Sequence, residues 1–135
     1  MFRSKGFGEI YLYVDQSAQN SEFCSKPSFS ICNQNYGVSI GRNSFAFGAG
    51  KWNLVEQIIK LNSISKSSGY KDDGSITILF NKNEVIKFDR IVWRKKDSIR
   101  FKGIQWDTFF GGSDDSWITP ITQVAYFRGV NLTVH

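Results

Sequence analysis

Apolar residues recur at every second position in several short stretches of this chain, and this spacing restricts the fold more than any other feature. In residues 8–17 (GEIYLYVDQS), Ile10, Leu12 and Val14 occupy alternate positions. Because side chains alternate between the two faces of a β-strand, these three predict a strand with one core face. The opposite face would carry Glu9, Tyr11, Tyr13 and Asp15. Either packing under a neighbouring loop or chemistry would account for two tyrosines on that polar face.

Short strand-like stretches also recur along the rest of the chain. Further strands are predicted at residues 36–47, 75–80, 84–88, 90–95, 99–110 and 122–135. Asn81, Lys82 and Asn83 predict a hairpin turn, and residues 61–74 read as a polar connection that ends in Asp73–Gly74. Residues 51–62 fit a helix or a strand by spacing, and their β-branched content favours a strand. About eight short strands predict an all-β fold, an antiparallel jelly roll or two-sheet sandwich.

The size and composition predict one globular domain over residues 1–135. Hydrophobic residues make up 41% of the chain and aromatic residues 16%, which excludes a disordered chain. The net charge of +5 suits an anionic partner, but the charge alone does not choose between nucleic acid, membrane and acidic polysaccharide. No recognised nucleic-acid-binding pattern is present, and no apolar run approaches the roughly 20 residues of a membrane span. We therefore expect neither a nucleic-acid nor a membrane partner.

The reactive residue types restrict the chemistry. Cys24 and Cys32 are close enough in sequence to form a disulfide in an oxidising compartment, although two separate buried thiols are the alternative. His135 is the only histidine, so neither a zinc site nor histidine acid–base chemistry is expected, and no other metal site is predicted. Serine-nucleophile, phosphate-loop and dinucleotide signatures are absent, so no cofactor is expected. Proton transfer would have to come from carboxylates, tyrosine, lysine or arginine.

Several longer strings resemble one known family. GFGEIYLYV, YGVSIGRNSFAF, GKWNLVEQIIKLN, DGSITILFNKNEVI and DTFFGGSDDSWITPITQVAYF occur in the same order as motifs of the family 14 polysaccharide lyases. The resemblance implies a β-jelly roll that cleaves uronate polymers such as alginate or glucuronan by β-elimination, without a cofactor. It also implies a secreted protein, and we expect a monomer whose partner is an acidic polysaccharide.

The resemblance also implies functional residues. Tyr11 and Tyr13 match the catalytic tyrosines of the family's groove. The family's active-site lysine, serine and arginine would fall upstream of Met1, so this chain is expected to lack the amino-terminal part of the jelly roll. Arg3 has the parity to point the same way as that arginine, without a claim that it substitutes for it.

Substrate-binding residues are predicted from strand parity and charge. The set comprises Arg3, Arg42, Gln105 and Asp107, with Trp106 assigned to the core. The reverse assignment of residues 104–109 to the two faces remains open. Two alternatives to a lyase also remain: a truncated relative that binds acidic polysaccharide without turnover, and an adhesion module that resembles a laminin G domain.

Overall fold

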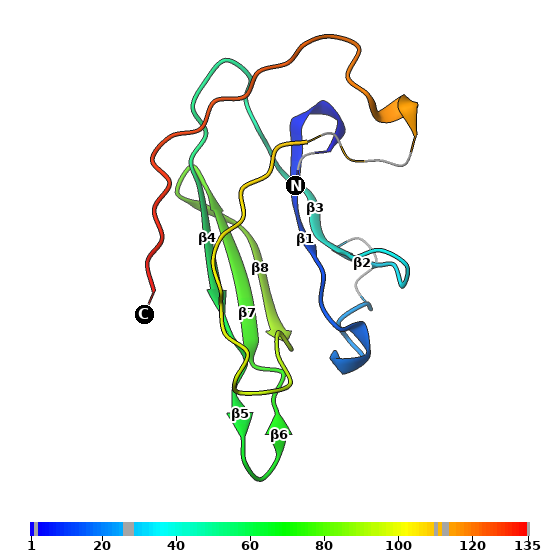
Figure 1. Cartoon of the computed structure of the whole chain (residues 1–135), viewed down its shortest axis with the longest axis vertical. Helices are drawn as coiled ribbons and strands as arrows, with labels where there is room; N and C mark the ends of the chain where they lie inside the picture. Colours follow the sequence, from blue (N-terminus) through cyan, green and yellow to red (C-terminus); the bar gives the residue numbers. More distant parts are fainter. Residues whose placement is uncertain (2, 26–28, 110, 112–113, 135) are drawn as a thin grey trace. The chain divides into compact units, whose positions relative to one another are not determined.

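A computed structural model describes residues 1, 3–25, 29–109, 111 and 114–134 of the chain (Figure 1). The chain divides into two compact units, Met1–Phe101 and Lys102–His135. No helix among the described residues is long and apolar enough to cross a bilayer.

The first unit contains two antiparallel sheets. Sheet A has the order β1 (Phe7–Leu12), β3 (Val38–Ala46), β2 (Ser30–Cys32), and sheet B has the order β4 (Val55–Lys60), β7 (Gly74–Phe80), β8 (Asn83–Ile91). A small hairpin pairs β5 (Ile64–Ser65) with β6 (Gly69–Tyr70). Short 3₁₀ turns occupy η1 (Ser4–Gly6) and η2 (Gln16–Ala18). All the described ladders are antiparallel, so the predicted all-β antiparallel fold is confirmed.

One apolar core joins the two sheets. Its buried members are Ile10, Leu12, Val38 and Ile40 from sheet A, Ile76, Ile78, Ile86, Phe88 and Ile91 from sheet B, and Phe23 from the connection after η2. Burying each such side chain stabilises the folded state by about 1.5–3 kcal/mol. The alternation in β1 therefore has the predicted cause, because Ile10 and Leu12 point into this core.

Two local predictions in sheet B are confirmed. The β7–β8 hairpin turns at Asn81 and Lys82, whose φ values of 50° and 71° are those of a two-residue turn matched to the twist of the strands. The stretch at residues 51–62 forms strand β4 rather than a helix.

Three boundaries were predicted wrongly. The strand predicted over residues 8–17 ends at Leu12, and Gln16–Ala18 form the turn η2 instead. The strands expected at 84–88 and 90–95 are one strand, β8, which ends at Ile91. The backbone beyond it bonds to side chains instead of a neighbouring strand: Gln19 pairs with Val92, and Asn62 accepts from Trp93 and Arg94. The connection at 61–74 was also incompletely predicted, because it contains the β5–β6 hairpin.

The second unit differs most from expectation. Strands were predicted at 99–110 and 122–135, but the described residues of these ranges form none, and the regular element of this unit is the 3₁₀ turn η3 (Asp115–Trp117). Within the unit, the rings of Trp106 and Phe127 pack edge-on, with their centroids 4.8 Å apart. Alternation predicts that a segment has two faces, but a ladder also requires a neighbouring backbone to pair with.

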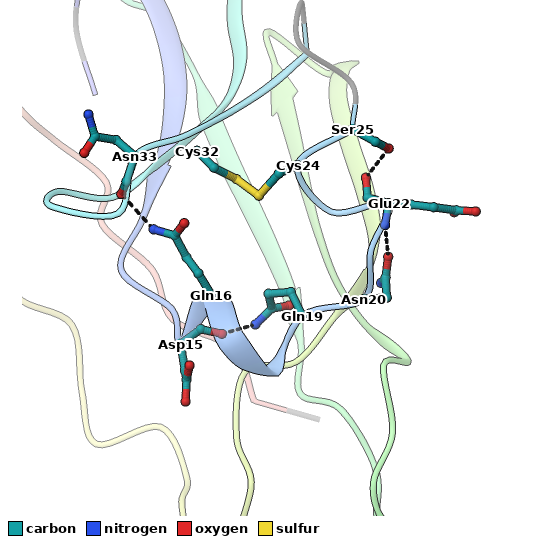
Figure 2. Close-up of a disulfide and its surroundings, with 9 residues drawn as sticks. All are labelled: Asp15, Gln16, Gln19, Asn20, Glu22, Cys24, Ser25, Cys32 and Asn33. Atoms are coloured by element: carbon teal, nitrogen blue, oxygen red, sulfur yellow. Dashed lines mark hydrogen bonds between the residues drawn. A yellow bond between two sulfur atoms is a disulfide. The ribbon is translucent and has the colours of Figure 1, made fainter.

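The predicted disulfide is confirmed, and it fastens the η2 connection to β2 (Figure 2). Cys24 and Cys32 are bonded, with their Cα atoms 5.7 Å apart. Nearby, Gln16 donates to the Asn33 carbonyl at 2.8 Å, and Gln19 donates to the Asp15 carbonyl at 2.9 Å. The same connection supplies Phe23 to the core, so the disulfide restrains a segment that the core needs.

Replacing both cysteines by serine is expected to lower the free energy of unfolding by about 2.5 kcal/mol, the entropy of closing so short a loop. Urea denaturation of the variant and of the unaltered chain measures the difference. The control is the unaltered chain in reducing agent, which should show the same loss. An unchanged urea midpoint in both would contradict a stabilising role for the bond.

Candidate functional site

The structure brings the two predicted tyrosines together on the polar side of β1. Their rings meet edge-on with centroids 5.4 Å apart. Tyr13 lies just beyond the end of the strand and is 82% exposed, whereas Tyr11 is partly buried. One phenol is therefore open to solvent, and the other is held in place beside it.

Tyr11 is held by the backbone at Gly37. The Gly37 N–H donates to the phenol oxygen at 3.0 Å, a contact that does not use the phenol's own hydrogen. A Cβ on residue 37 would lie 2.6 Å from the Tyr11 ring, so glycine is required for this close approach. The hydroxyl of Tyr11 thus has a fixed position and retains a proton to donate.

A buried carboxylate lies on the same side of the strand. The Glu9 side chain has no exposed surface, and both of its carboxylate oxygens accept hydrogen bonds from neighbouring side chains. Oε1 accepts from Arg3 Nε at 2.8 Å, and Oε2 accepts from Ser39 Oγ at 2.7 Å and from Arg42 Nε at 3.0 Å. The carboxylate is therefore paired with two cations, as a buried charge requires.

The electrostatics of Glu9 follow from these contacts. Burial by itself raises the pKa of the Glu9 carboxyl, but the hydrogen bonds from Arg3, Ser39 and Arg42 together outweigh burial and hold this pKa below its usual value. Glu9 is thus ionised at neutral pH and unsuited to act as a base, because its oxygens are occupied and covered.

Arg42 reaches Glu9 because strand β3 bulges. Gly8 pairs with Phe45 and Ile10 pairs with Ile40, so residues 41–44 lie opposite Glu9 alone. Positive φ values at Gly41 (64°) and Asn43 (67°) make this bend. Bulges re-aim side chains, and here the result is a guanidinium turned back onto the face of β1.

Arg3 reaches Glu9 from the other side. Its N–H donates to the Phe7 carbonyl at 2.7 Å, and the Glu9 N–H donates to the Met1 carbonyl at 3.1 Å, so Met1 and Arg3 lie beside β1. The Arg3 guanidinium lies 5.8 Å from the centre of the Tyr11 ring, within cation–π range. We call the resulting group the β1 cluster: Arg3, Glu9, Tyr11, Tyr13, Ser39 and Arg42.

Two members of the β1 cluster were not predicted. Glu9 was placed on the polar face of the strand but given no role, and its spacing of two from Tyr11 was the available signal. Ser39 carried no signal, because its contact with Glu9 depends on the register of two strands 30 residues apart in sequence.

The remaining predicted binding residues lie in the second unit. Gln105 donates to Asp107 at 2.6 Å, and both are exposed. Trp106 between them is 57% exposed, rather than buried as its assignment to a core predicted. Substrate binding by Gln105 and Asp107 stays a prediction.

The donors of the β1 cluster suit an anion rather than a metal ion. Arginine guanidiniums and phenol hydroxyls recognise carboxylates and can transfer protons. Among the described residues, no group of three or more histidine, cysteine, aspartate or glutamate side chains is arranged to hold a metal.

Comparison with known proteins identifies the class. The family model of polysaccharide lyase 14 matches residues 1–130, and the chain belongs to this family. Its structure is similar to that of the marine PL-14 alginate lyase from Aplysia kurodai, with a TM-score of 0.70 and 28% sequence identity. The match covers 86% of this chain and 43% of that one, so the chain spans less than half of that lyase. No curated protein gives a significant match.

Glu9→Gln is expected to reduce the acid sensitivity of folding. A carboxyl whose pKa is lowered by folding stabilises the protein fully above its ordinary value of 4.5, and this stabilisation is lost as the pH falls through the folded value. Between about pH 7 and about pH 3, the unaltered chain should therefore lose more unfolding free energy than the variant. Urea titrations at both pH values measure the two losses.

The matched control is Glu22→Gln, which removes an exposed carboxylate paired with Arg90. This variant should keep the acid sensitivity of the unaltered chain. Equal losses in all three proteins would show that the Glu9 network adds nothing to stability.

Proposed function

We propose that the β1 cluster is the tyrosine-bearing part of a site that cleaves alginate or a related polyuronate by β-elimination. The observation that carries the proposal is a chain of contacts in a member of polysaccharide lyase family 14. Arg3 and Arg42 pair with Glu9, Arg3 also lies over the Tyr11 ring, and Tyr13 packs against Tyr11. The similar structure from Aplysia kurodai is described as an alginate lyase, which supports alginate as the first substrate to test.

The reaction explains why these residue types are needed. A base removes the proton at C5, next to the uronate carboxylate, and the electron pair becomes the C4–C5 double bond. The bond from C4 to the glycosidic oxygen breaks, and an acid protonates that leaving oxygen. No water is consumed. The carbanion character at C5 is stabilised when cations neutralise the carboxylate, and the two phenols supply groups for proton transfer.

The geometry of Arg42 supports a role in neutralising that carboxylate. Its Nε is occupied by Glu9 and Ser39, and its side chain is 39% exposed. Within the described part of the chain, neither terminal nitrogen of Arg42 makes a hydrogen bond that would compete with substrate. An anchored guanidinium with an open outer edge is the geometry that binds a carboxylate through two N–H groups.

The test is to incubate the chain with alginate and with glucuronan and to follow the absorbance of unsaturated uronate ends. An absorbance rise that requires the folded chain supports the proposal. Tyr70→Phe removes a phenol outside the β1 cluster, on β6, and should leave the rate unchanged. A folded chain that produces no unsaturated ends from either polymer would overturn catalysis by this chain.

The second candidate is a module that binds acidic polysaccharide without cleaving it. It is favoured by the extent of the match, since the chain spans 43% of the similar lyase. This candidate predicts that the chain is retarded in alginate-containing gels without releasing product. No retardation and no product would exclude both candidates.

The setting of the protein is part of the proposal. We infer an extracellular location, supported by the Cys24–Cys32 bond, because such bonds persist mainly in oxidising compartments. The partner proposed is an acidic polysaccharide, bound by a monomer.

A further inference from the structure

We propose that Glu9 is a positioning residue for uronate recognition: its carboxylate orients the guanidiniums of Arg3 and Arg42 toward the carboxylate of the sugar. This inference rests on the proposed function and assigns a role to a residue that does not itself touch the substrate.

The division of hydrogen bonds at Glu9 supports this role. Each carboxylate oxygen holds the Nε of a different arginine, Oε1 that of Arg3 and Oε2 that of Arg42. Binding through Nε fixes the plane of a guanidinium. Arg3 also contacts Oε1 through Nη2 at 2.5 Å. Among the described residues, Nη1 of Arg3 and both terminal nitrogens of Arg42 thus stay available for another partner. The two arginine side chains are 26% and 39% exposed, while Glu9 is covered. The carboxylate therefore sits behind the two cations, away from the solvent side.

Ser39 further restricts the orientation of the Arg42 side chain. Its hydroxyl donates to Glu9 Oε2 at 2.7 Å, and the Nε of Arg42 lies 3.3 Å from the same hydroxyl oxygen. Arg42 comes from a bulge with two positive φ angles, where the backbone ladder does not hold it. The contacts with Glu9 and Ser39 are thus what directs this side chain.

Positioning and simple electrostatics predict opposite results for Glu9→Gln. The substitution removes one negative charge, so electrostatic attraction alone would make a polyanion bind more tightly. If Glu9 instead orients the arginines, the same substitution weakens binding despite the more positive site. The sign of the change therefore separates the two explanations.

The experiment is calorimetric titration of an alginate trisaccharide into the full chain carrying Tyr13→Phe, a substitution expected to slow turnover during the measurement. Adding Glu9→Gln is expected to raise Kd about ten-fold, the effect of losing one charge-assisted hydrogen bond. Adding Glu22→Gln instead removes an exposed carboxylate and should leave Kd within about two-fold. With Tyr13 intact, Glu9→Gln should raise KM and also lower kcat, because the same two cations bind the sugar carboxylate and stabilise the carbanion character at C5.

Each outcome decides the matter. Equal or tighter binding by a folded Glu9→Gln protein overturns the inference alone. If this variant gives no cooperative thermal transition, Ser39→Ala replaces it, with an expected loss of about five-fold. Unchanged binding by Ser39→Ala then overturns the inference. If the Tyr13→Phe parent binds no alginate, the proposed function fails, and the inference fails with it.

Discussion

A Tyr13→Phe variant of this chain is expected to release unsaturated uronate ends about 10²- to 10⁴-fold more slowly than the unaltered chain. The substitution removes only the hydroxyl, which is the group proposed to transfer a proton. The ring contact with Tyr11 remains available, and the residue is 82% exposed, so little packing is lost. Initial rates of absorbance increase with alginate give the comparison.

Two controls make this result interpretable. Thermal unfolding should be unchanged, since an exposed hydroxyl contributes little to stability. Tyr70→Phe, the same change outside the β1 cluster, should keep the full rate. A Tyr13→Phe protein as active as the unaltered chain would exclude the Tyr13 hydroxyl from the reaction and leave Tyr11 as the phenol to examine.

Gly41→Ala is expected to cost about 2–5 kcal/mol of unfolding free energy, from backbone strain and overpacking together. Gly41 has a φ of 64°, in the region that residues with a Cβ rarely adopt. A Cβ there would also lie 2.6 Å from Cδ1 of Ile86, which is 1% exposed in the core. Urea denaturation at neutral pH measures the loss, which is a large part of a typical domain's stability.

Gly50→Ala separates the two contributions. Gly50 has nearly the same φ, 68°, but a Cβ there would meet nothing within 4 Å. This variant should show the strain alone, and the excess loss in Gly41→Ala then measures the collision with Ile86. Equal losses in the two variants would mean that Ile86 moves aside freely and that the core is loosely packed at the bulge.

The sequence predicted the parts of the fold that depend on local pattern. Strand β1 followed from the alternation of Ile10 and Leu12 with polar residues, and the β7–β8 turn from Asn81 and Lys82. The Tyr11–Tyr13 pair followed from the same alternation, because residues two apart on a strand share a face. Such features need only neighbouring residues in the chain, which a single sequence displays.

The features that were missed depend on contacts between distant segments. Strand β8 ends at Ile91 because the side chains of Gln19 and Asn62 capture the backbone that follows. Likewise, alternation in residues 122–134 has no described partner strand to turn it into a ladder. A pattern of apolar residues states which face a segment would bury, but not which other segment will be there to cover it.

For the candidate site, the sequence predicted residues but not their arrangement. Arg3 and Arg42 were predicted to bind substrate, and the structure places both against a carboxylate of the chain itself, that of Glu9. The register of β1 and β3 decides this arrangement, and no local pattern reveals that register when a bulge interrupts it.

The number of residues in the bulge, 41–44, determines the direction in which the Arg42 side chain points. In an uninterrupted ladder, shortening a strand by one residue reverses every side chain after it. Here the flanking pairs, Gly8 with Phe45 and Ile10 with Ile40, are anchored on both sides of the extra residues. Insertions or deletions in this segment can therefore redirect the cation while the core stays intact. A change in the length of this one segment would thus redirect a residue that we propose to bind uronate, while the paired residues on either side keep their register.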